Sequence, residues 1–303
     1  MSTPVSQPHT TATRRAFLSI SAAGLALVVS RPSFAAKARK PRKIGIGLQM
    51  WSIREDAKKD MDAALKSVAE LGFEGVEFAG FHKYAEDAQG LRKKLDELKL
   101  KAVGSHVGAA AFADDKVKHT IDFHKTIGCR YLIVGGDGRF SDASGSVEYA
   151  KVMNAAAKKL KPAGLFCGHH NHTEEFKKVG DQPNDKTYWD LFIERTGKDV
   201  AIEHDIGWST VAGLDPIALI KRYPGRTKLT HFKASLPEGV KDKKPFIGQD
   251  TIDWRGVIKA CDEVGGTEWF IVEQEDYPKG MTPIECVKTS LDGLKTILAD
   301  MGR

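Results

Sequence analysis

The feature that most constrains this chain is a strand–helix alternation that repeats eight times between residue 44 and the C-terminus. Each unit has a short apolar run rich in β-branched residues, and an amphipathic segment separates one run from the next. The runs that we predict as strands are Ile44–Trp51, Gly75–Phe78, Lys101–His106, Tyr131–Gly135, Leu165–His170, Val200–Asp205, Lys228–Lys233 and Trp269–Glu273.

Glycines that stop helices, such as Gly72 and Gly128, follow many of the amphipathic segments. Predicted helices include Met61–Leu71, Ala88–Leu98, Lys116–Ile127, Val147–Leu160, Trp189–Thr196, Pro216–Tyr223 and Trp254–Val264. Eight such units in about 260 residues predict an α/β fold, a single (β/α)8 TIM barrel. A doubly wound open sheet fits less well, because no glycine-rich phosphate fingerprint follows the first strand.

Polar residues gather where the predicted strands end. These residues are Glu77, His106, His170, Asp205, His231 and Glu273. In a barrel the carboxyl ends of the strands converge on one mouth, where active sites are built. The pattern therefore predicts a single polar site at that mouth.

Strand periodicity indicates which of these side chains meet. His170 and His172 share one face of the fifth strand, and Glu203 shares a face of the sixth with Asp205. The seventh strand adds His231, and the eighth adds a carboxylate. Imidazoles and carboxylates from adjacent strands suit one divalent ion such as Mn, Co, Zn, Fe or Ni rather than calcium, with Mg also open.

The N-terminus has the pattern of an export signal. The pair Arg14-Arg15 precedes a small-residue and apolar stretch that ends near Ser30, and Ser33-Phe34-Ala35 offers a cleavage site. Paired arginines are typical of the bacterial twin-arginine route. We expect a signal peptide at 1–35, a basic leader at 36–43, a barrel at 44–303, and a periplasmic or secreted protein.

Charge and cysteines exclude several classes of protein. Removing residues 1–35, which hold three arginines and no acidic residue, lowers the formal net charge from +6 to about +3. The remaining charge does not indicate a nucleic-acid partner, and no apolar run is long enough for stable membrane insertion. Four widely spaced cysteines form no C-x-x-C motif, so buried free thiols are expected.

Several motifs in this order resemble the xylose-isomerase-like sugar phosphate isomerase/epimerase superfamily, over residues 44–300. The motifs are the opening strand Ile46–Arg54, Gly75–Ala79, His170-Asn-His172 with Glu175-Phe176, the run Glu203–Trp208, His231-x-Lys233 and Val272-Glu-Gln274. The resemblance implies that one divalent metal ion is held by His170, Asp205, His231 and Glu273. His170 departs from the family, because many relatives have Glu at that position.

The resemblance also implies roles for the surrounding residues. Catalysis falls to Glu273 and His170 as acid–base groups, with His106 or His172 as the second base if the metal fully occupies His170. Lys233 is expected to steady an enolate oxygen. Substrate contact is expected from residues near the mouth, namely Trp51, Glu77, His172, Trp208 and Glu275. Ala234 and Gln249-Asp250 also depart from the pattern, since relatives often have Asp and Glu-Gly there.

The predicted activity is a metal-dependent sugar isomerase or epimerase that abstracts a proton next to a carbonyl through a metal-stabilised enediolate. The alternative is a lyase that eliminates a β-substituent from a keto-sugar or 3-keto-glycoside. An abasic-site endonuclease and a non-catalytic sugar-binding barrel fit less well, since the first needs more metal ligands and a basic groove and the second needs no ligand set. The expected partner is a small-molecule sugar or keto-sugar; the sequence does not indicate an oligomeric state.

Overall fold

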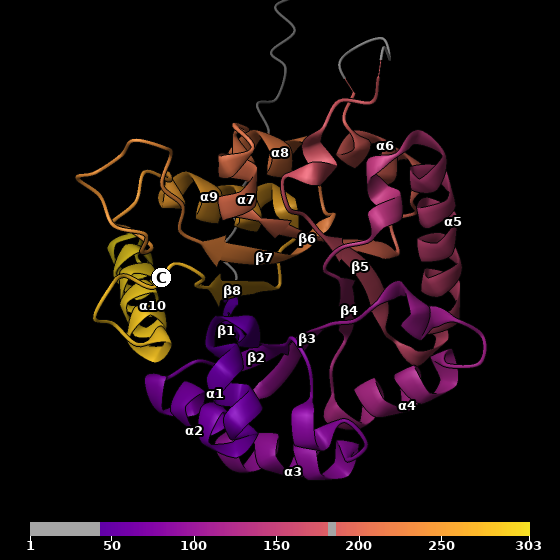
Figure 1. Ribbon diagram of the computed structural model, residues 1–303, viewed down its shortest axis with the longest axis horizontal. Coiled ribbons are helices and arrows are strands. Elements are labelled where there is room, and N and C mark those ends of the chain that lie inside the picture. The colour runs from indigo at the N-terminus through magenta and orange to yellow at the C-terminus, as the bar shows by residue number, and fades with distance from the viewer. Residues whose placement is uncertain (1–42, 181–185) are drawn as a thin grey trace, which may run out of the picture. The chain divides into compact units, whose positions relative to one another are not determined.

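A computed structural model describes residues 43–180 and 186–303. They form a closed, all-parallel barrel in which each strand pairs with the next and the eighth pairs with the first. The strands are β1 (Gly45–Gln49), β2 (Gly75–Phe78), β3 (Lys101–His106), β4 (Tyr131–Val134), β5 (Phe166–His170), β6 (Val200–Asp205), β7 (Thr227–Lys233) and β8 (Trp269–Glu273). Figure 1 shows the strands in the middle and the helices around them. The predicted TIM barrel is confirmed, whereas the predicted signal peptide and most of the leader lie outside the described residues.

Strand boundaries agree with the prediction at both ends for β2, β3, β6 and β8. The largest difference is at β1, which was predicted to run to Trp51 but ends at Gln49. The Gln49 side chain accepts a hydrogen bond from the backbone N–H of Trp51 and so starts a 3-10 turn at Met50. The chain therefore leaves the direction of the strand after Gln49, and Trp51 hydrogen-bonds to Glu275.

The helices that cover the barrel are α1 (Arg54–Lys59), α2 (Met61–Leu71), α3 (Ala88–Leu98), α4 (Val117–Ile127), α5 (Ala143–Leu160), α6 (Tyr188–Arg195), α7 (Ile206–Val211), α8 (Pro216–Arg222), α9 (Trp254–Ala260) and α10 (Pro283–Asp300). Three of them, α1, α7 and α10, were not among the predicted segments. The sequence carries a clear start for α10: Thr282 and Glu285 form a reciprocal capping box, with Pro283 at the first helical position.

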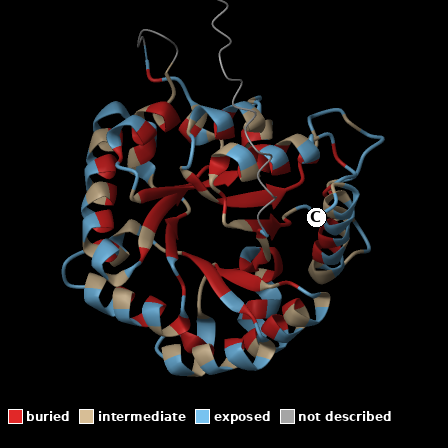
Figure 2. Ribbon diagram, turned by 180° about the vertical axis from the view of Figure 1, so that it is seen from behind, coloured by how far each residue is buried: buried red, intermediate tan, exposed pale blue. Residues whose placement is uncertain are grey.

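Two layers of apolar side chains hold the barrel together. The interior of the barrel is filled by Val103, Tyr131, Ile133, Ala201, Leu229 and Ile271. A larger layer packs between the strands and the helices. Figure 2 shows this division, with buried residues on the strands and exposed ones on the outer helix faces. A packed barrel core leaves no open pore. These interior side chains therefore lie directly beneath the polar residues at the mouth.

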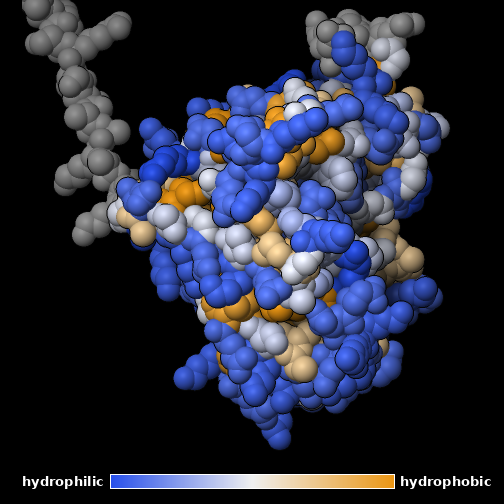
Figure 3. All heavy atoms as spheres, turned by 60° about the vertical axis from the view of Figure 1, so that its left-hand side comes forward, coloured by the Kyte–Doolittle hydropathy of each residue, from blue (hydrophilic) through white to orange (hydrophobic). Residues whose placement is uncertain are grey.

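The surface and the thiols also agree with the sequence. The face in Figure 3 is mainly hydrophilic with small hydrophobic patches, and the exposed large apolar side chains in the described part are Trp51 and Val211. All four cysteines are buried and free, as predicted. Within residues 43–180 and 186–303, no helix has the length and apolarity needed to cross a membrane.

Gly104 on β3 is expected to be intolerant of a side chain. A Cβ there would lie 2.3 Å from Glu77 Oε1 and 3.3 Å from Leu229 Cδ1, and Glu77 is fully buried. Gly104→Ala should lower the free energy of unfolding by about 1–3 kcal/mol, as measured by urea denaturation. Gly136→Ala is the matched control, because in the described part of the chain no heavy atom beyond its two chain neighbours lies within 4 Å of its Cβ position. Equal stabilities of the two variants would contradict the prediction.

His204 should make the fold sensitive to acid. It lies on β6, fully enclosed by protein, with Nε2 2.7 Å from Ser209 Oγ, and burial lowers its pKa to about 3. In the unfolded chain this imidazole takes up a proton near pH 6.5, whereas in the folded protein it stays neutral. The free energy of unfolding therefore falls by about 1.4 kcal/mol for each pH unit below 6.5.

His204→Gln keeps a donor for Ser209 but does not titrate. Between pH 7 and pH 5 the wild type should therefore lose about 2 kcal/mol more unfolding free energy than the variant. Urea denaturation across this range measures the difference. Parallel pH profiles for the two proteins would rule out His204 as the source.

Candidate metal centre and active site

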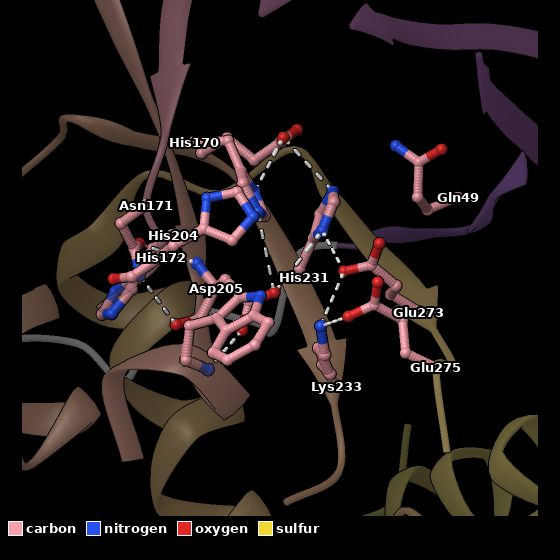
Figure 4. Close-up of polar contacts among 12 residues, drawn as sticks. Gln49, His170, Asn171, His172, His204, Asp205, His231, Lys233, Glu273 and Glu275 are labelled. Atoms are coloured by element: carbon pink, nitrogen blue, oxygen red, sulfur yellow. Dashed lines mark hydrogen bonds and ion pairs between the residues drawn. The ribbon is translucent and has the colours of Figure 1, made fainter. Parts of the chain in front are cut away.

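Four side chains from four consecutive strands converge at the mouth of the barrel. His170 ends β5, Asp205 ends β6, His231 lies on β7 and Glu273 ends β8. One ligand atom from each lies within 4.8 Å of the other three, and all four residues are buried. Figure 4 shows them pointing toward a common centre. The structure thus brings together the four residues of the predicted ligand set.

The spacing within this cluster fits a single ion. Asp205 Oδ2 lies 3.9 Å from His170 Nε2 and 3.7 Å from His231 Nδ1, and His231 Nδ1 lies 3.1 Å from Glu273 Oε2. Atoms held about 2.1 Å from a tetrahedral ion lie about 3.4 Å apart. Asp205 Oδ2 is also buried with no hydrogen-bond partner in the described part of the chain, which is costly unless a cation satisfies it. This cluster can hold one divalent metal ion.

A second group, made of His106, His170, Glu203 and His231, is equally compact, but in it one carboxylate oxygen lies among three imidazole rings. Oε2 of Glu203 lies 2.7 Å from His106 Nε2, 3.2 Å from His231 Nε2 and 3.3 Å from His170 Nδ1. Three imidazole nitrogens therefore already surround this oxygen. Glu203 faces the nitrogens of His170 and His231 that point away from Asp205.

Glu77 on β2 supports His231 in the same way. Its Oε2 lies 2.6 Å from His231 Nε2 and accepts a 2.8 Å hydrogen bond from Gln49 Nε2. A carboxylate on the second nitrogen of a ligating histidine fixes the ring and its tautomer. The arrangement leaves Nδ1 of His231 for the ion.

The charges of these buried groups are set by one another. Burial alone would lower the pKa of His231, but Glu203, Glu273 and Glu77 raise it well above its usual value. Burial, with the charge of His231, lowers the pKa of His170 to about 3. Without an ion, a proton on His231 therefore supplies the positive charge that these carboxylates need. A metal ion held by His231 would replace that proton, because imidazole binds a metal in its neutral form.

The rim of the site is a series of contacts from the 3-10 turn after β1 to α7. Lys233 is ion-paired with Glu275, and its Nζ lies 3.8 Å from Glu273 Oε2 and 4.2 Å from the centre of the Trp208 ring. Trp51 Nε1 donates a 2.9 Å hydrogen bond to Glu275 Oε1. These contacts hold the ammonium group of Lys233 next to the metal cluster, with the Trp208 ring beside it.

The remaining predicted residues fall at two levels. His172 lies at the rim, with its ring 4.8 Å from that of His170 and 5.4 Å from Trp208. His106 lies deeper, with its ring 5.2 Å from that of His170. Glu77, predicted to contact substrate, is fully buried beneath His231, where it supports the ring.

Sequence reasoning left two residues out of the site. Glu203 was placed on the same strand face as Asp205 but was given no role, although this shared face is the signal that identifies it. Gln49 ends β1 and holds Glu77, and no pattern in the sequence singles out its amide. Both are completely buried, so they act from below the ligand cluster.

Comparisons with known proteins agree with this architecture. The family model of the xylose isomerase-like TIM barrel matches residues 65–297. An inosose dehydratase from Lacticaseibacillus casei is 24% identical over 266 residues, which cover 74% of this chain and 85% of the dehydratase. A solved sugar phosphate isomerase/epimerase from Parabacteroides distasonis is 25% identical with a TM-score of 0.71, covering 88% of this chain and 98% of that one.

A zinc-bound structure of the IOLI protein shares the fold. It is 14% identical with a TM-score of 0.61, covering 85% of this chain and 99% of that one.

Proposed function

The chain belongs to the xylose isomerase-like TIM barrel family, and from this membership we propose that it is a metal-dependent lyase acting on a keto-sugar. In this reaction a base removes the proton next to the carbonyl, the freed electron pair forms a carbon–carbon double bond, and the substituent on the β-carbon leaves with its own bonding pair. The observation that carries the proposal is the cluster of His170, Asp205, His231 and Glu273. A divalent ion bound there supplies a Lewis acid that polarises the carbonyl.

Glu273 is the proposed base. Burial would raise its pKa, but His231 and Lys233 hold the pKa below its usual value, so the carboxylate is in the ionised form that a base requires. Lys233, next to Glu273 and beside Trp208, is placed to stabilise negative charge on the substrate oxygen. The two roles require the reacting carbon to lie at the β7–β8 side of the mouth.

The surroundings of His170 favour elimination over epimerisation. Epimerisation needs bases on opposite faces of one carbon, and the resemblance puts these bases on the fifth and eighth strands. Both nitrogens of His170 already face other groups: Nε2 faces the ligand cluster, and Nδ1 lies 3.3 Å from Glu203. His170 therefore has no nitrogen left for the substrate, whereas elimination needs one base and an acid for the leaving group.

His172, at the rim, is the proposed acid. The name of the 24%-identical relative, a dehydratase, supports this choice.

Product analysis tests the proposal. The protein loaded with Zn, Mn or Co is incubated with keto-sugars and 3-keto-glycosides, and products are identified by mass spectrometry and NMR. Zinc is included because of the fold neighbour that binds it. Elimination produces an unsaturated keto-sugar and releases water or an alcohol. If no keto-sugar reacts under any of the metal conditions, the proposal is wrong.

An isomerase or epimerase is the second candidate, and one observation favours it. His172 follows β5 and Glu273 ends β8, so β6 and β7 lie between them, and His172 can serve as a second base if the substrate spans the site. The 25%-identical solved structure carries the name of that activity. The same experiment decides between them, because isomerisation conserves the mass of the substrate and deuterated water then labels only the exchanged carbon.

A further inference from the structure

A buried hydrogen-bonded chain lies behind β5, on the side away from the metal cluster. His169 is fully buried there, stacked on Phe140 and packed against Phe192. Its Nδ1 lies 2.8 Å from the Tyr149 hydroxyl, and its Nε2 lies 3.2 Å from Glu175 Oε1. Neither His169 nor Tyr149 contributes to the ligand cluster.

The other oxygen of Glu175 reaches back to the active site. Oε2 accepts a 2.8 Å hydrogen bond from the backbone N–H of His172. Glu175 is itself buried although it lies in a short loop turn, Glu174–Phe176. A buried carboxylate is expensive unless its oxygens are satisfied, and here one oxygen takes His169 and the other takes the backbone of His172.

The donors and acceptors along the chain are fixed by the carboxylate. Burial would raise the pKa of Glu175, but the bond from His169 holds it below its usual value, so Glu175 is an acceptor at both oxygens. His169 must then donate through Nε2 and accept the Tyr149 hydroxyl at Nδ1. The chain runs from Tyr149 through His169 and Glu175 to the backbone of His172.

We propose that Glu175 is a positioning residue that holds His172 at the rim of the active site, and that Tyr149 and His169 hold Glu175. The assignment rests on the proposed function, since His172 is taken there as the acid for the leaving group. One oxygen of Glu175 contacts His169 on the outer face of β5, and the other accepts the backbone N–H of His172 in the loop that follows. The bond from its N–H to Glu175 therefore restrains the backbone of His172.

Kinetics of Glu175→Ala, with the metal at full occupancy, provide the first test. Loss of the tie should lower kcat by about tenfold or more, because small displacements of an acid–base group are costly, and KM should change little. In a His172→Ala background the same substitution should have no further effect on kcat. Glu174→Ala is the control, since that neighbouring glutamate is exposed. Losses that multiply in the double variant would overturn the proposal.

A conservative variant separates positioning from a need for charge. In Glu175→Gln the amide oxygen can still accept the His172 N–H, and the amide nitrogen can donate to Nε2 of His169 if the imidazole changes tautomer. Nδ1 then donates to Tyr149, whose hydroxyl must accept. Glu175→Gln should therefore keep kcat within about threefold of wild type, and adding Tyr149→Phe should remove this rescue. If the double variant Glu175→Gln, Tyr149→Phe keeps the kcat of Glu175→Gln, Tyr149 does not hold Glu175 through His169.

A measurement without turnover distinguishes failure of this inference from failure of the proposed function. In 1H–15N NMR of the folded protein, the His172 amide should show the downfield shift of a bond to a carboxylate. It should move upfield in Glu175→Ala and stay in place in Glu174→Ala. An unmoved amide in Glu175→Ala overturns the positioning role even if elimination is observed. A moved amide with no activity on any keto-sugar overturns the function alone.

Discussion

His231→Ala should weaken metal binding by about 100-fold or more, because it removes a central ligand, and even partners of ligands contribute 10–100-fold. His231 is also the cation among three buried carboxylates, with Glu77, Glu203 and Glu273 each having an oxygen within 3.2 Å of its ring nitrogens. Alanine removes the cation that contacts all three carboxylates, so the metal-free variant should also lose about 3–5 kcal/mol of stability. Elemental analysis and competition titration with a chelator measure the first effect, and urea denaturation measures the second.

Glu77→Gln is the graded control for this prediction. It keeps the ring of His231 and its Nδ1 but replaces the carboxylate that holds Nε2 at 2.6 Å. Metal affinity should therefore fall by about 10–100-fold, less than for His231→Ala. If His231→Ala keeps full metal occupancy, the ligand set is wrong. If Glu77→Gln binds metal as tightly as wild type, Glu77 does not support the ligand.

The sequence predicts the ligand cluster because the cluster depends on strand position. His170, Asp205 and Glu273 end their strands, and a parallel barrel brings strand ends together regardless of side-chain detail. Alternation of faces also separates His170 from His169, which the structure places on opposite sides of β5. Such features follow from chain periodicity alone.

The support beneath the cluster does not follow from periodicity. Which nitrogen of His231 faces the ion is decided by Glu77, which is 154 residues away, and the place of Glu77 depends on the missing side chain of Gly104. Likewise, Gln49 Nε2 donates to Glu77, which is 28 residues away on β2. These contacts depend on side-chain orientation across the barrel, which no local pattern encodes.

Glu273→Gln should lower exchange of the substrate's α-hydrogen with deuterated water by about 10²-fold or more, in the range of losses for a general base. Glutamine nearly preserves the shape of the side chain. It cannot accept the proton, however, and it weakens the contact with His231 Nδ1, 3.1 Å away. Metal must therefore be in excess, so that occupancy does not limit the rate.

Glu275→Gln is the matched control, because Glu275 lies two residues further along and contacts Lys233 and Trp51 rather than the cluster. Its variant should lose much less exchange and mainly raise KM, since Lys233 loses its ion-pair partner at the rim. Exchange at the wild-type rate in Glu273→Gln would place the base elsewhere, and His106 or His172 would then be the group to replace next.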